Sequence, residues 1–330
     1  MNFSDKYQDV IEEARSLVQP ALDLSAQMMR EVAEKSPEGL RERITQTVGR
    51  PGKRLRSILL FLLANSNCET KDLKRMARAA ASVEMLHLAS LVHDDVIDGS
   101  ELRRGQSSMN SAFGNKIAVL AGDYMLAQSL VFVLEEEDRR IPQNLANAAS
   151  SLVAGEILEI DHAENMSISF DEYIRVIEGK TASLLIACTK CGAILAGYNN
   201  EIVEDCGKLG LHFGIAFQII DDILDYGIGA ESLGKKKFED LQNGLITLPM
   251  LLYFQKNPKE EMENLIKNAS EPNTANLIVE KLKNANCFEE AKSVASFHLQ
   301  KATEVLEKLP PSSINTLLKD FFEAMAERKN

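Results

Sequence analysis

The stretch "LKRMARAAASVEMLHLASLVHDD" (Leu73–Asp95) predicts the fold class. Its apolar side chains, such as Leu73, Met76 and Ala80, recur every three or four residues, which is helical spacing. Because the stretch is apolar nearly all round, it is typical of a buried central helix. The same character returns in three further segments, residues 147–165, 180–197 and 210–226. No alternating strand pattern is present, so we expect an all-α fold.

The prolines bear on the domain organisation. None of the nine prolines falls within residues 52–141 or 143–248, so two long stretches lack the strongest helix breaker. The chain has 330 residues, 45% of them hydrophobic, which is ample for one large core. We expect one domain over residues 1–330, a bundle of roughly ten to twelve helices. Its motif-bearing core spans about 52–249, and a more polar helical cover without site residues spans about 255–330.

Charge and cysteine content exclude several classes of protein. The net charge of −12 argues against a nucleic-acid-binding protein, which would carry a broad basic face. No stretch approaches the ~20 apolar residues that span a bilayer, so no transmembrane segment is expected. The first residues lack a basic segment followed by an apolar one, which predicts a cytoplasmic protein. Cys188 and Cys191 form one C-x-x-C inside an apolar run, so the cysteines are expected to be reduced core thiols.

Two aspartate triplets share the spacing D-D-x-x-D, and each follows an apolar helical run. They consist of Asp94, Asp95 and Asp98, and of Asp221, Asp222 and Asp225. Residues i and i+4 lie on one face of a helix, so the outer members of each triplet form a pair of carboxylates. Mg²⁺ combines one or two carboxylates with phosphate oxygens of a substrate. A single triplet would fit a solvated helix end, but the repetition favours two metal sites.

Basic residues gather near both triplets although the chain is acidic. The stretches concerned contribute Arg50, Lys53, Arg54 and Arg56, then Arg103 and Arg104, then Lys180, and finally Lys235, Lys236 and Lys237. Singly, each fits a solvated surface charge. Together with divalent cations, Arg and Lys would neutralise clustered phosphates. The glycine-punctuated lysine loop after the second triplet predicts a flap that closes over bound phosphate.

Seven motifs now make the sequence resemble the trans-isoprenyl diphosphate (polyprenyl) synthase family, long-chain type. They are "GKRLR" (52–56), "HDDVIDGSELRRG" (93–105), "GNKIAVLAGDY" (114–124), "GEILE" (155–159), "GKTASL" (179–184), "FQIIDDILDY" (217–226) and "GKKKFEDLQNG" with "TLP" (234–249). The resemblance implies the isoprenoid synthase fold, with helices around a central cavity, and a homodimer. It also implies head-to-tail condensation of isopentenyl diphosphate with an allylic diphosphate, geranyl or farnesyl.

The resemblance assigns the metal ligands. About three Mg²⁺ ions per active site, which Mn²⁺ can replace, would be held by Asp94 and Asp98 on one wall and by Asp221 on the other. Asp95, Asp222 and Asp225 complete the two metal-binding triplets. These ions and nearby cations would stabilise the departing pyrophosphate.

The resemblance also assigns the substrate-binding residues. The allylic diphosphate would meet Arg103, Lys180, Thr181, Gln218 and Lys235. Isopentenyl diphosphate would meet Lys53, Arg56, His87 and Arg104. Of all these residues, the ones expected to be catalytic are Asp94, Asp98, Asp221, Lys180 and Arg103.

The sequence departs from the family pattern at two positions. Leu245 stands where the family has a lysine before x-Thr-Leu-Pro, so one cation near the allylic diphosphate is absent. Lys236 or Lys237 is a candidate to compensate. Glu159 stands where long-chain members often have glutamine. Neither change removes a metal ligand, so an active enzyme is expected.

Two alternatives come from other classes. The pairs Glu84-x-x-His87 and Glu159-x-x-His162 have the pattern of a di-iron carboxylate bundle, but this reading leaves the aspartates unexplained. A non-catalytic subunit of a heteromeric prenyl synthase would be expected to lack one triplet, whereas both are whole.

Product length is predicted from residues just before the first aspartates. In the family, large side chains at these positions block the tunnel that receives the growing chain, and here they are the small Ala89 and Ser90. Met85 and Phe132 are candidates for a deeper floor. We expect a medium-to-long product of about eight isoprene units, because no ring fills the upper tunnel. Farnesyl or geranylgeranyl diphosphate is the alternative product.

Overall fold

A computed structural model describes residues 4–50, 52–67, 72–103, 105–163, 165–228, 238–269 and 271–328. Over these residues the chain is all-helical, with fifteen helices, thirteen of them of seven or more residues. This count treats α8, η1 and α9 as one continuous helix. The all-α prediction is confirmed. The helix number exceeds the expected ten to twelve because short helices such as α5 (Met109–Phe113) and α11 (Glu239–Gln242) have too few residues for a periodic pattern.

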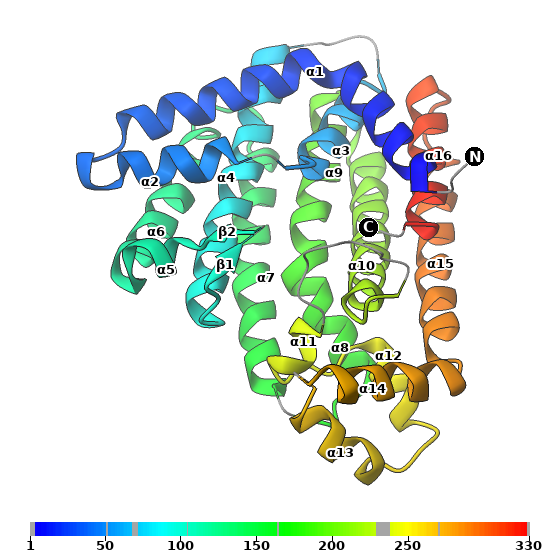
Figure 1. Cartoon of the computed structure of the whole chain (residues 1–330). Helices are drawn as coiled ribbons and strands as arrows, with labels where there is room; N and C mark the ends of the chain where they lie inside the picture. The colour runs from blue at the N-terminus through cyan, green and yellow to red at the C-terminus, as the bar shows by residue number, and fades with distance from the viewer. Residues whose placement is uncertain are drawn as a thin grey trace.

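The long helices form the bundle around which the site is built (Figure 1). The N-terminal half contains α1 (Ser4–Lys35), α2 (Glu38–Gly49), α3 (Leu55–Ala64), α4 (Leu73–Ile97), α6 (Asn115–Val131) and α7 (Arg140–His162). The centre of the chain contains α8 (Phe170–Ile177), the π-helical turn η1 (Glu178–Ala182), α9 (Ser183–Leu195) and α10 (Asn200–Asp225). The C-terminal part contains α12 (Leu248–Phe254), α13 (Glu260–Lys267), α14 (Pro272–Asn284), α15 (Cys287–Leu306) and α16 (Ser313–Ala326).

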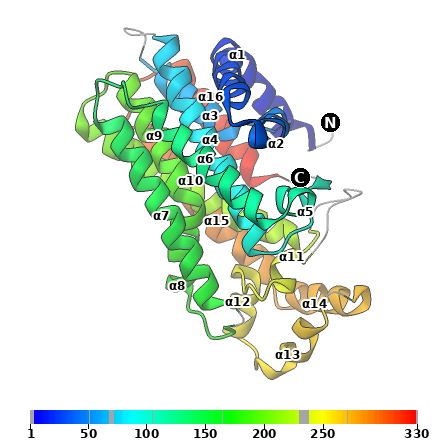
Figure 2. The same ribbon diagram turned by 90° about the vertical axis from the view of Figure 1, so that its left-hand side faces the viewer.

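The two views show how the layers are arranged. In Figure 1, α4, α7, α9, α10 and α15 run roughly parallel, and α1 lies across one end of the bundle. In Figure 2, α13 and α14 lie at the opposite end from α1. One large apolar cluster joins α3, α9, α10 and α15, and a smaller one joins α1, α2, α4 and α6. In the described part of the chain, no helix is long and apolar enough to cross a membrane.

Local sequence fixes where the site-bearing helices begin. Asp72 caps α4 by accepting hydrogen bonds from the backbone N–H groups of Lys74 and Arg75. The Asn199 side chain caps α10 in the same way, through the N–H of Ile202. Because the first residue of each helix is set, the triplets fall at defined places at the far ends of α4 and α10.

A short hairpin follows α4. Strand β1 (Leu102–Arg103) pairs antiparallel with β2 (Gln106–Ser107). The sequence pattern gave no sign of strands, because two residues per strand are too few to show alternation. The hairpin does not change the fold class, but it carries Arg103.

Candidate active site

A cavity of about 710 Å³ opens between the ends of α4 and α10. Five members of the two aspartate triplets line it, together with many of the predicted substrate-binding residues. From the predicted site they are Asp94, Asp98, Asp221, Asp222, Asp225, Arg56, His87, Ser90, Arg103, Lys180, Thr181 and Gln218. Residues far apart in the sequence are therefore brought together at one cavity.

In the first triplet, the outer aspartates line the cavity and the middle one does not. Asp95 is only 2% exposed, and its Oδ1 accepts a hydrogen bond of 2.8 Å from Nε of Arg103. This ion pair ties the β1–β2 hairpin to α4. Asp95 therefore positions Arg103, while Asp94 and Asp98 face the space where a cation would lie.

Lys180 lies opposite the first triplet, on the π-helical turn η1. Its ammonium group pairs with two carboxylates of α7, Glu159 and, at 3.0 Å, Glu156. Gly155 and Gly179 allow this approach, since a Cβ on Gly155 would overlap the backbone of Gly179 and Lys180. A π-helical turn within a helix is frequent at functional sites.

Burial and a neighbouring carboxylate raise the pKa values of Asp94 and Asp98, the outer members of the first triplet. The pKa of Asp94 rises to about 7, mainly because burial disfavours the charged form, and Glu156 raises it further. The pKa of Asp98 is raised for the same reasons. Lys180 and Arg103 oppose both shifts. Glu156 is a site residue that the sequence analysis did not single out.

In the second triplet, hydrogen bonds occupy the middle aspartate. Asp222 is 2% exposed and accepts hydrogen bonds from Tyr173 Oη (2.6 Å) and Gln218 Nε2 (2.8 Å). Thr181 in turn donates to Gln218 Oε1 at 2.5 Å. Burial raises the pKa of Asp222 to about 7, although these hydrogen bonds oppose the shift. Thr181 and Gln218, predicted to contact substrate, thus also belong to the network that holds Asp222.

The outer aspartates of this triplet have different partners. Asp225 accepts hydrogen bonds from the backbone N–H groups of Glu239 (3.1 Å) and Asp240 (3.3 Å), the first residues of α11. Burial raises the pKa of Asp225 to about 6. Asp221 forms an ion pair of 2.8 Å with Arg328.

Arg328 extends the site to the C-terminal end of the chain. Its side chain is 8% exposed and its guanidinium lies 5.2 Å from the ring centre of Phe217 and 5.6 Å from that of Tyr7. From the sequence, no site residue was expected after residue 255. Nothing in the local pattern around Arg328 indicated that it reaches a metal-ligand candidate on α10.

The predicted isopentenyl diphosphate site is only partly gathered. Arg56 Nη1 lies 3.3 Å from His87 Nε2, and both residues line the cavity. Lys53 is exposed, does not line the cavity, and lies 5.1 Å from the ring centre of Tyr7. Arg104 and Lys235 lie outside the described residues. The roles of Lys53, Arg104 and Lys235 stay predictions.

Of the four residues predicted to set product length, one lines the cavity and three pack in or against the apolar clusters. Ser90 lines it, whereas Ala89 is 2% exposed and packs in the smaller apolar cluster with Met85. Phe132 packs against both apolar clusters. Leu245, at the position where the family has a lysine, lines the cavity, so the missing charge faces the site.

The carboxylates at the cavity show whether a metal ion would fit there. Among the described residues, no three His, Cys, Asp or Glu side chains lie close enough together to hold a metal unaided. Pairs of carboxylates at the cavity wall fit Mg²⁺, which takes its remaining ligands from water and substrate phosphates. The di-iron alternative gains no support, because Glu84 is buried and accepts hydrogen bonds from the N–H and Oγ of Ser57.

Comparisons with known proteins agree with this geometry. The family model described as polyprenyl synthetase matches residues 37–284. An all-trans-nonaprenyl-diphosphate synthase (geranyl-diphosphate specific) of Rhodobacter capsulatus is 34% identical over 269 residues, 81% of this chain and 82% of that protein. The structure of a decaprenyl diphosphate synthase from Rhodobacter capsulatus matches with a TM-score of 0.87 and 28% identity, over 97% of this chain and 99% of that one. A polyprenyl synthase from Caulobacter crescentus CB15, complexed with calcium and isoprenyl diphosphate, matches with a TM-score of 0.88 and 26% identity, over 97% and 98%.

Proposed function

The chain belongs to the polyprenyl synthetase family, and on that premise we propose that it condenses isopentenyl diphosphate with an allylic diphosphate to give a long-chain trans-polyprenyl diphosphate. It is a transferase with the isoprenoid synthase fold. The observation that carries the proposal is the single cavity lined by carboxylates of α4 and α10 and by cations of α3, β1 and η1. Opposed carboxylates and cations at one cavity suit a substrate held as a metal–diphosphate complex.

Divalent cations fit the carboxylate pairs. We assign Asp94 and Asp98 to one wall, and Asp221 with Asp225 to the other, as ligands of Mg²⁺ or Mn²⁺, with about three ions per site. When bound, the ions neutralise charge that develops on the departing diphosphate. Burial that raises the pKa of Asp94 and Asp225 supports this, because a cation removes the cost of charging crowded, buried carboxylates.

The chain's own cations orient and stabilise the diphosphates. Arg103, held by Asp95, and Lys180, held by Glu156 and Glu159, are fixed before substrate arrives, so they pay little ordering entropy on binding. Breaking the allylic carbon–oxygen bond leaves a carbocation, which the double bond of isopentenyl diphosphate attacks. Arg56 and His87 would hold that second substrate. The departed diphosphate then accepts the proton that the new cation loses, and no protein nucleophile takes part.

Apolar walls beside the carboxylates would receive the product. Leu91, Leu152 and Leu184 line the same cavity as the charged residues. The small Ala89 and Ser90 lie on α4 next to the first triplet. A chain of about eight isoprene units is our specific proposal, since no aromatic ring stands at either position to fill the space.

The test is incubation of the purified chain with labelled isopentenyl diphosphate, farnesyl diphosphate and Mg²⁺. Chromatography of the dephosphorylated products should give a ladder that ends well beyond fifteen carbons. Activity of the isolated chain would also separate an enzyme from a non-catalytic subunit. No extension of farnesyl diphosphate, or a single addition that stops at twenty carbons, would support the shorter-chain alternative.

The homodimer that the family implies has a candidate interface on α6 and α7. Large apolar side chains exposed on and between these helices are Val119, Leu120, Leu130, Val131, Leu134, Val153, Ile157 and Ile160. Three of them, Val153, Ile157 and Ile160, form one stripe on α7 at helical spacing. A patch of this kind marks an interaction surface, and a two-fold dimer would cover it on both copies.

Light scattering after size exclusion tests the dimer. The wild type should elute with twice the chain mass, and Ile157→Glu should shift the population to monomers. Leu277→Glu is the matched control, because Leu277 is also exposed but lies on α14, away from the patch. If Ile157→Glu remains a dimer, the interface lies elsewhere on the molecule.

A further inference from the structure

Both members of the Glu84-x-x-His87 pair on α4 contact the start of α3. Ser57 Oγ donates to Glu84 Oε1 at 2.7 Å, and Arg56 Nη1 lies 3.3 Å from His87 Nε2. Residues i and i+3 lie on one face of a helix, and Arg56 and Ser57 are neighbours in the first turn of α3. Two adjacent polar contacts therefore join the start of α3 to α4.

Glu84 supplies a cap for α3 that the residue before this helix does not. That residue is Arg54, whose side chain makes no capping hydrogen bond with the described residues and has only donors. The first N–H groups of a helix have no partner within the helix, and a negative charge is favourable near them. Glu84 Oε1 accepts from the backbone N–H of Ser57 at 3.3 Å. A side chain of α4 therefore completes the first turn of α3.

The contact between Glu84 and Ser57 is buried. Glu84 is 6% exposed, and Ser57 is 0% exposed. A buried carboxylate is costly unless hydrogen bonds satisfy it, and well-packed apolar side chains would join the two helices at less cost. Hydrogen bonds add direction, which apolar contacts lack. They therefore fix how α3 is turned relative to α4, and with it the direction of Arg56.

Arg56 and His87 carry this geometry to the substrate cavity. Both side chains are half-buried and line the cavity. A guanidinium only donates, so His87 Nε2 is the acceptor in their contact. The two residues lie on different helices, so a small turn of α3 would separate them.

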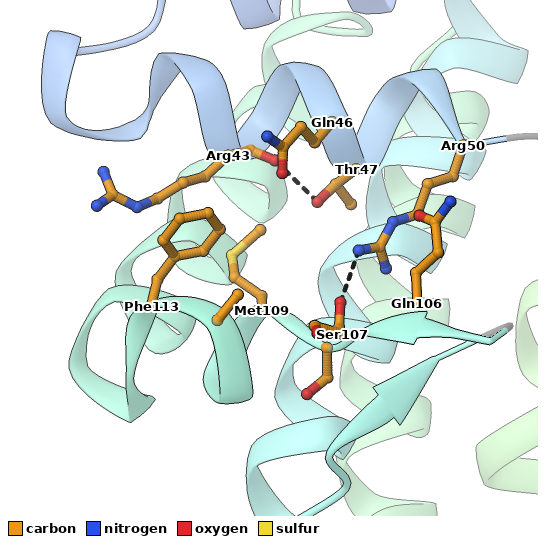
Figure 3. Close-up of a pocket in the computed structure, with 10 residues that line it drawn as sticks. Arg43, Gln46, Thr47, Arg50, Gln106, Ser107, Met109 and Phe113 are labelled. Atoms are coloured by element: carbon orange, nitrogen blue, oxygen red, sulfur yellow. Dashed lines mark hydrogen bonds between the residues drawn. The ribbon is translucent and has the colours of Figure 1, made fainter.

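Other contacts hold the allylic side of the site. Arg103 pairs with Asp95. The hairpin that carries Arg103 is tied to the end of α2, because Arg50 Nη2 donates to the backbone oxygen of Ser107 at 2.8 Å (Figure 3). Lys180 pairs with carboxylates of α7. Because none of these contacts involves α3, loosening α3 should affect one substrate and leave the other.

Resting on the proposed function, which assigns Arg56 and His87 to isopentenyl diphosphate, we propose that Glu84 positions these two residues. Glu84 does not itself line the cavity. By holding Ser57, it orients the first turn of α3 so that Arg56 can donate to the diphosphate while His87 fixes the guanidinium. Glu84 is therefore a positioning residue for one of the two substrates.

Steady-state assays of the full chain, with each substrate varied in turn, test the proposal. Glu84→Ala should raise the Michaelis constant for isopentenyl diphosphate about tenfold or more, because it removes charged hydrogen bonds, and should leave that for the allylic diphosphate within about twofold. Glu84→Gln keeps an acceptor oxygen for Ser57 and should lie closer to the wild type.

Glu136→Ala is the matched control. Glu136 is also 6% exposed and pairs with an arginine, Arg75, but neither of these residues lines the cavity. The control therefore removes an equally buried carboxylate, and both Michaelis constants should stay as in the wild type.

A double variant tests whether Glu84 acts through Arg56. If it does, Glu84→Ala should add less than about twofold to the Michaelis constant for isopentenyl diphosphate once Arg56→Gln is present. Circular dichroism confirms folding. If Glu84→Ala does not fold, Ser57→Ala tests the same contact from the other side.

Calorimetric titration with isopentenyl diphosphate separates a failure of this proposal from a failure of the proposed function, because it needs no turnover. Absence of condensation by the wild type would contradict the proposed function, whereas weaker binding in Glu84→Ala than in Glu136→Ala would still support the positioning role. Equal rises in the two Michaelis constants, additive effects with Arg56→Gln, or wild-type binding in Glu84→Ala would overturn it.

Discussion

The two aspartate triplets have the same spacing but different surroundings. At the end of α4, the middle aspartate Asp95 holds a cation, Arg103. At the end of α10, the middle aspartate Asp222 is held by the neutral donors Tyr173 and Gln218. The first triplet therefore fixes positive charge at the cavity wall, whereas the second is itself fixed by a hydrogen-bond network. One motif serves two purposes because its partners lie on other elements.

Replacing an outer aspartate should lower turnover more than any other substitution, and the loss should be equal for the two triplets. Asp94→Ala and Asp221→Ala each remove a proposed metal ligand, so we expect turnover to fall about a thousandfold or more. Steady-state assays with farnesyl diphosphate, isopentenyl diphosphate and Mg²⁺ measure this. Asp161→Ala, an exposed aspartate of α7 that does not line the cavity, should keep wild-type turnover. Full activity in excess chelator would contradict the metal-dependent mechanism.

The middle aspartates should distinguish the two triplets. Asp95→Asn breaks the ion pair that orients Arg103, so the Michaelis constant for the allylic substrate should rise about ten- to a hundredfold. Asp222→Asn keeps one acceptor oxygen, for either Tyr173 or Gln218, and leaves the Arg103 ion pair intact, so it should change that constant less. The Michaelis constant for the allylic substrate is measured for both variants. If Asp222→Asn raised the allylic constant more than Asp95→Asn, the assigned difference between the triplets would be wrong.

The pH dependence of metal binding follows from the raised pKa values. Because the pKa of Asp94 is about 7, a cation must displace a proton below that pH. The apparent affinity for Mn²⁺ should therefore be constant above pH 8 and fall about tenfold per pH unit below pH 7. Calorimetry between pH 5.5 and 8.5 measures it, at roughly half-unit steps. Asp94→Asn should flatten the profile, and an unchanged slope in that variant would assign the titration to another carboxylate.

The sequence predicted the outer carboxylates better than the middle ones for a physical reason. Helical spacing alone places Asp94 and Asp98 on one face, so their position in the cavity needed no distant information. The partner of Asp222 is Tyr173, 49 residues earlier in the chain, and the partner of Asp221 is Arg328, at the C-terminal end. Such pairs depend on how helices pack, and no local pattern encodes them. The polar tail was predicted as a cover for the core, yet its end reaches the cavity.

The two triplets also differ in the residues that precede them, which bears on product length. Only the first triplet follows small residues that border the proposed tunnel. Ala89→Phe should shorten the final product by several isoprene units, because a ring would occupy space beside α4 and α6, where overpacking also costs about 1–3 kcal/mol. Chromatography of dephosphorylated products measures the length. Ala79→Phe, at an equally buried alanine of α4 far from Asp94, controls for lost stability. An unchanged product spectrum would show that the tunnel does not run past Ala89.

The smallest expected effect concerns Leu245, on the side of the second triplet. Leu245 lines the cavity, and its backbone N–H donates to the oxygen of Asp240 at 2.8 Å, so its side chain is held near the carboxylates of α10. Leu245→Lys places an ammonium group there, which should lower the Michaelis constant of the allylic diphosphate about three- to tenfold, since a partly exposed ion pair contributes little more. Leu245→Met matches the size without the charge and should behave as the wild type. Because the added charge interacts through a partly hydrated cavity, the gain in affinity for the allylic diphosphate should shrink as salt is raised from low to physiological concentration. If Leu245→Lys binds no better than Leu245→Met at low salt, another cation already neutralises the diphosphate on this wall, and the two triplets differ less in charge than their sequences suggest.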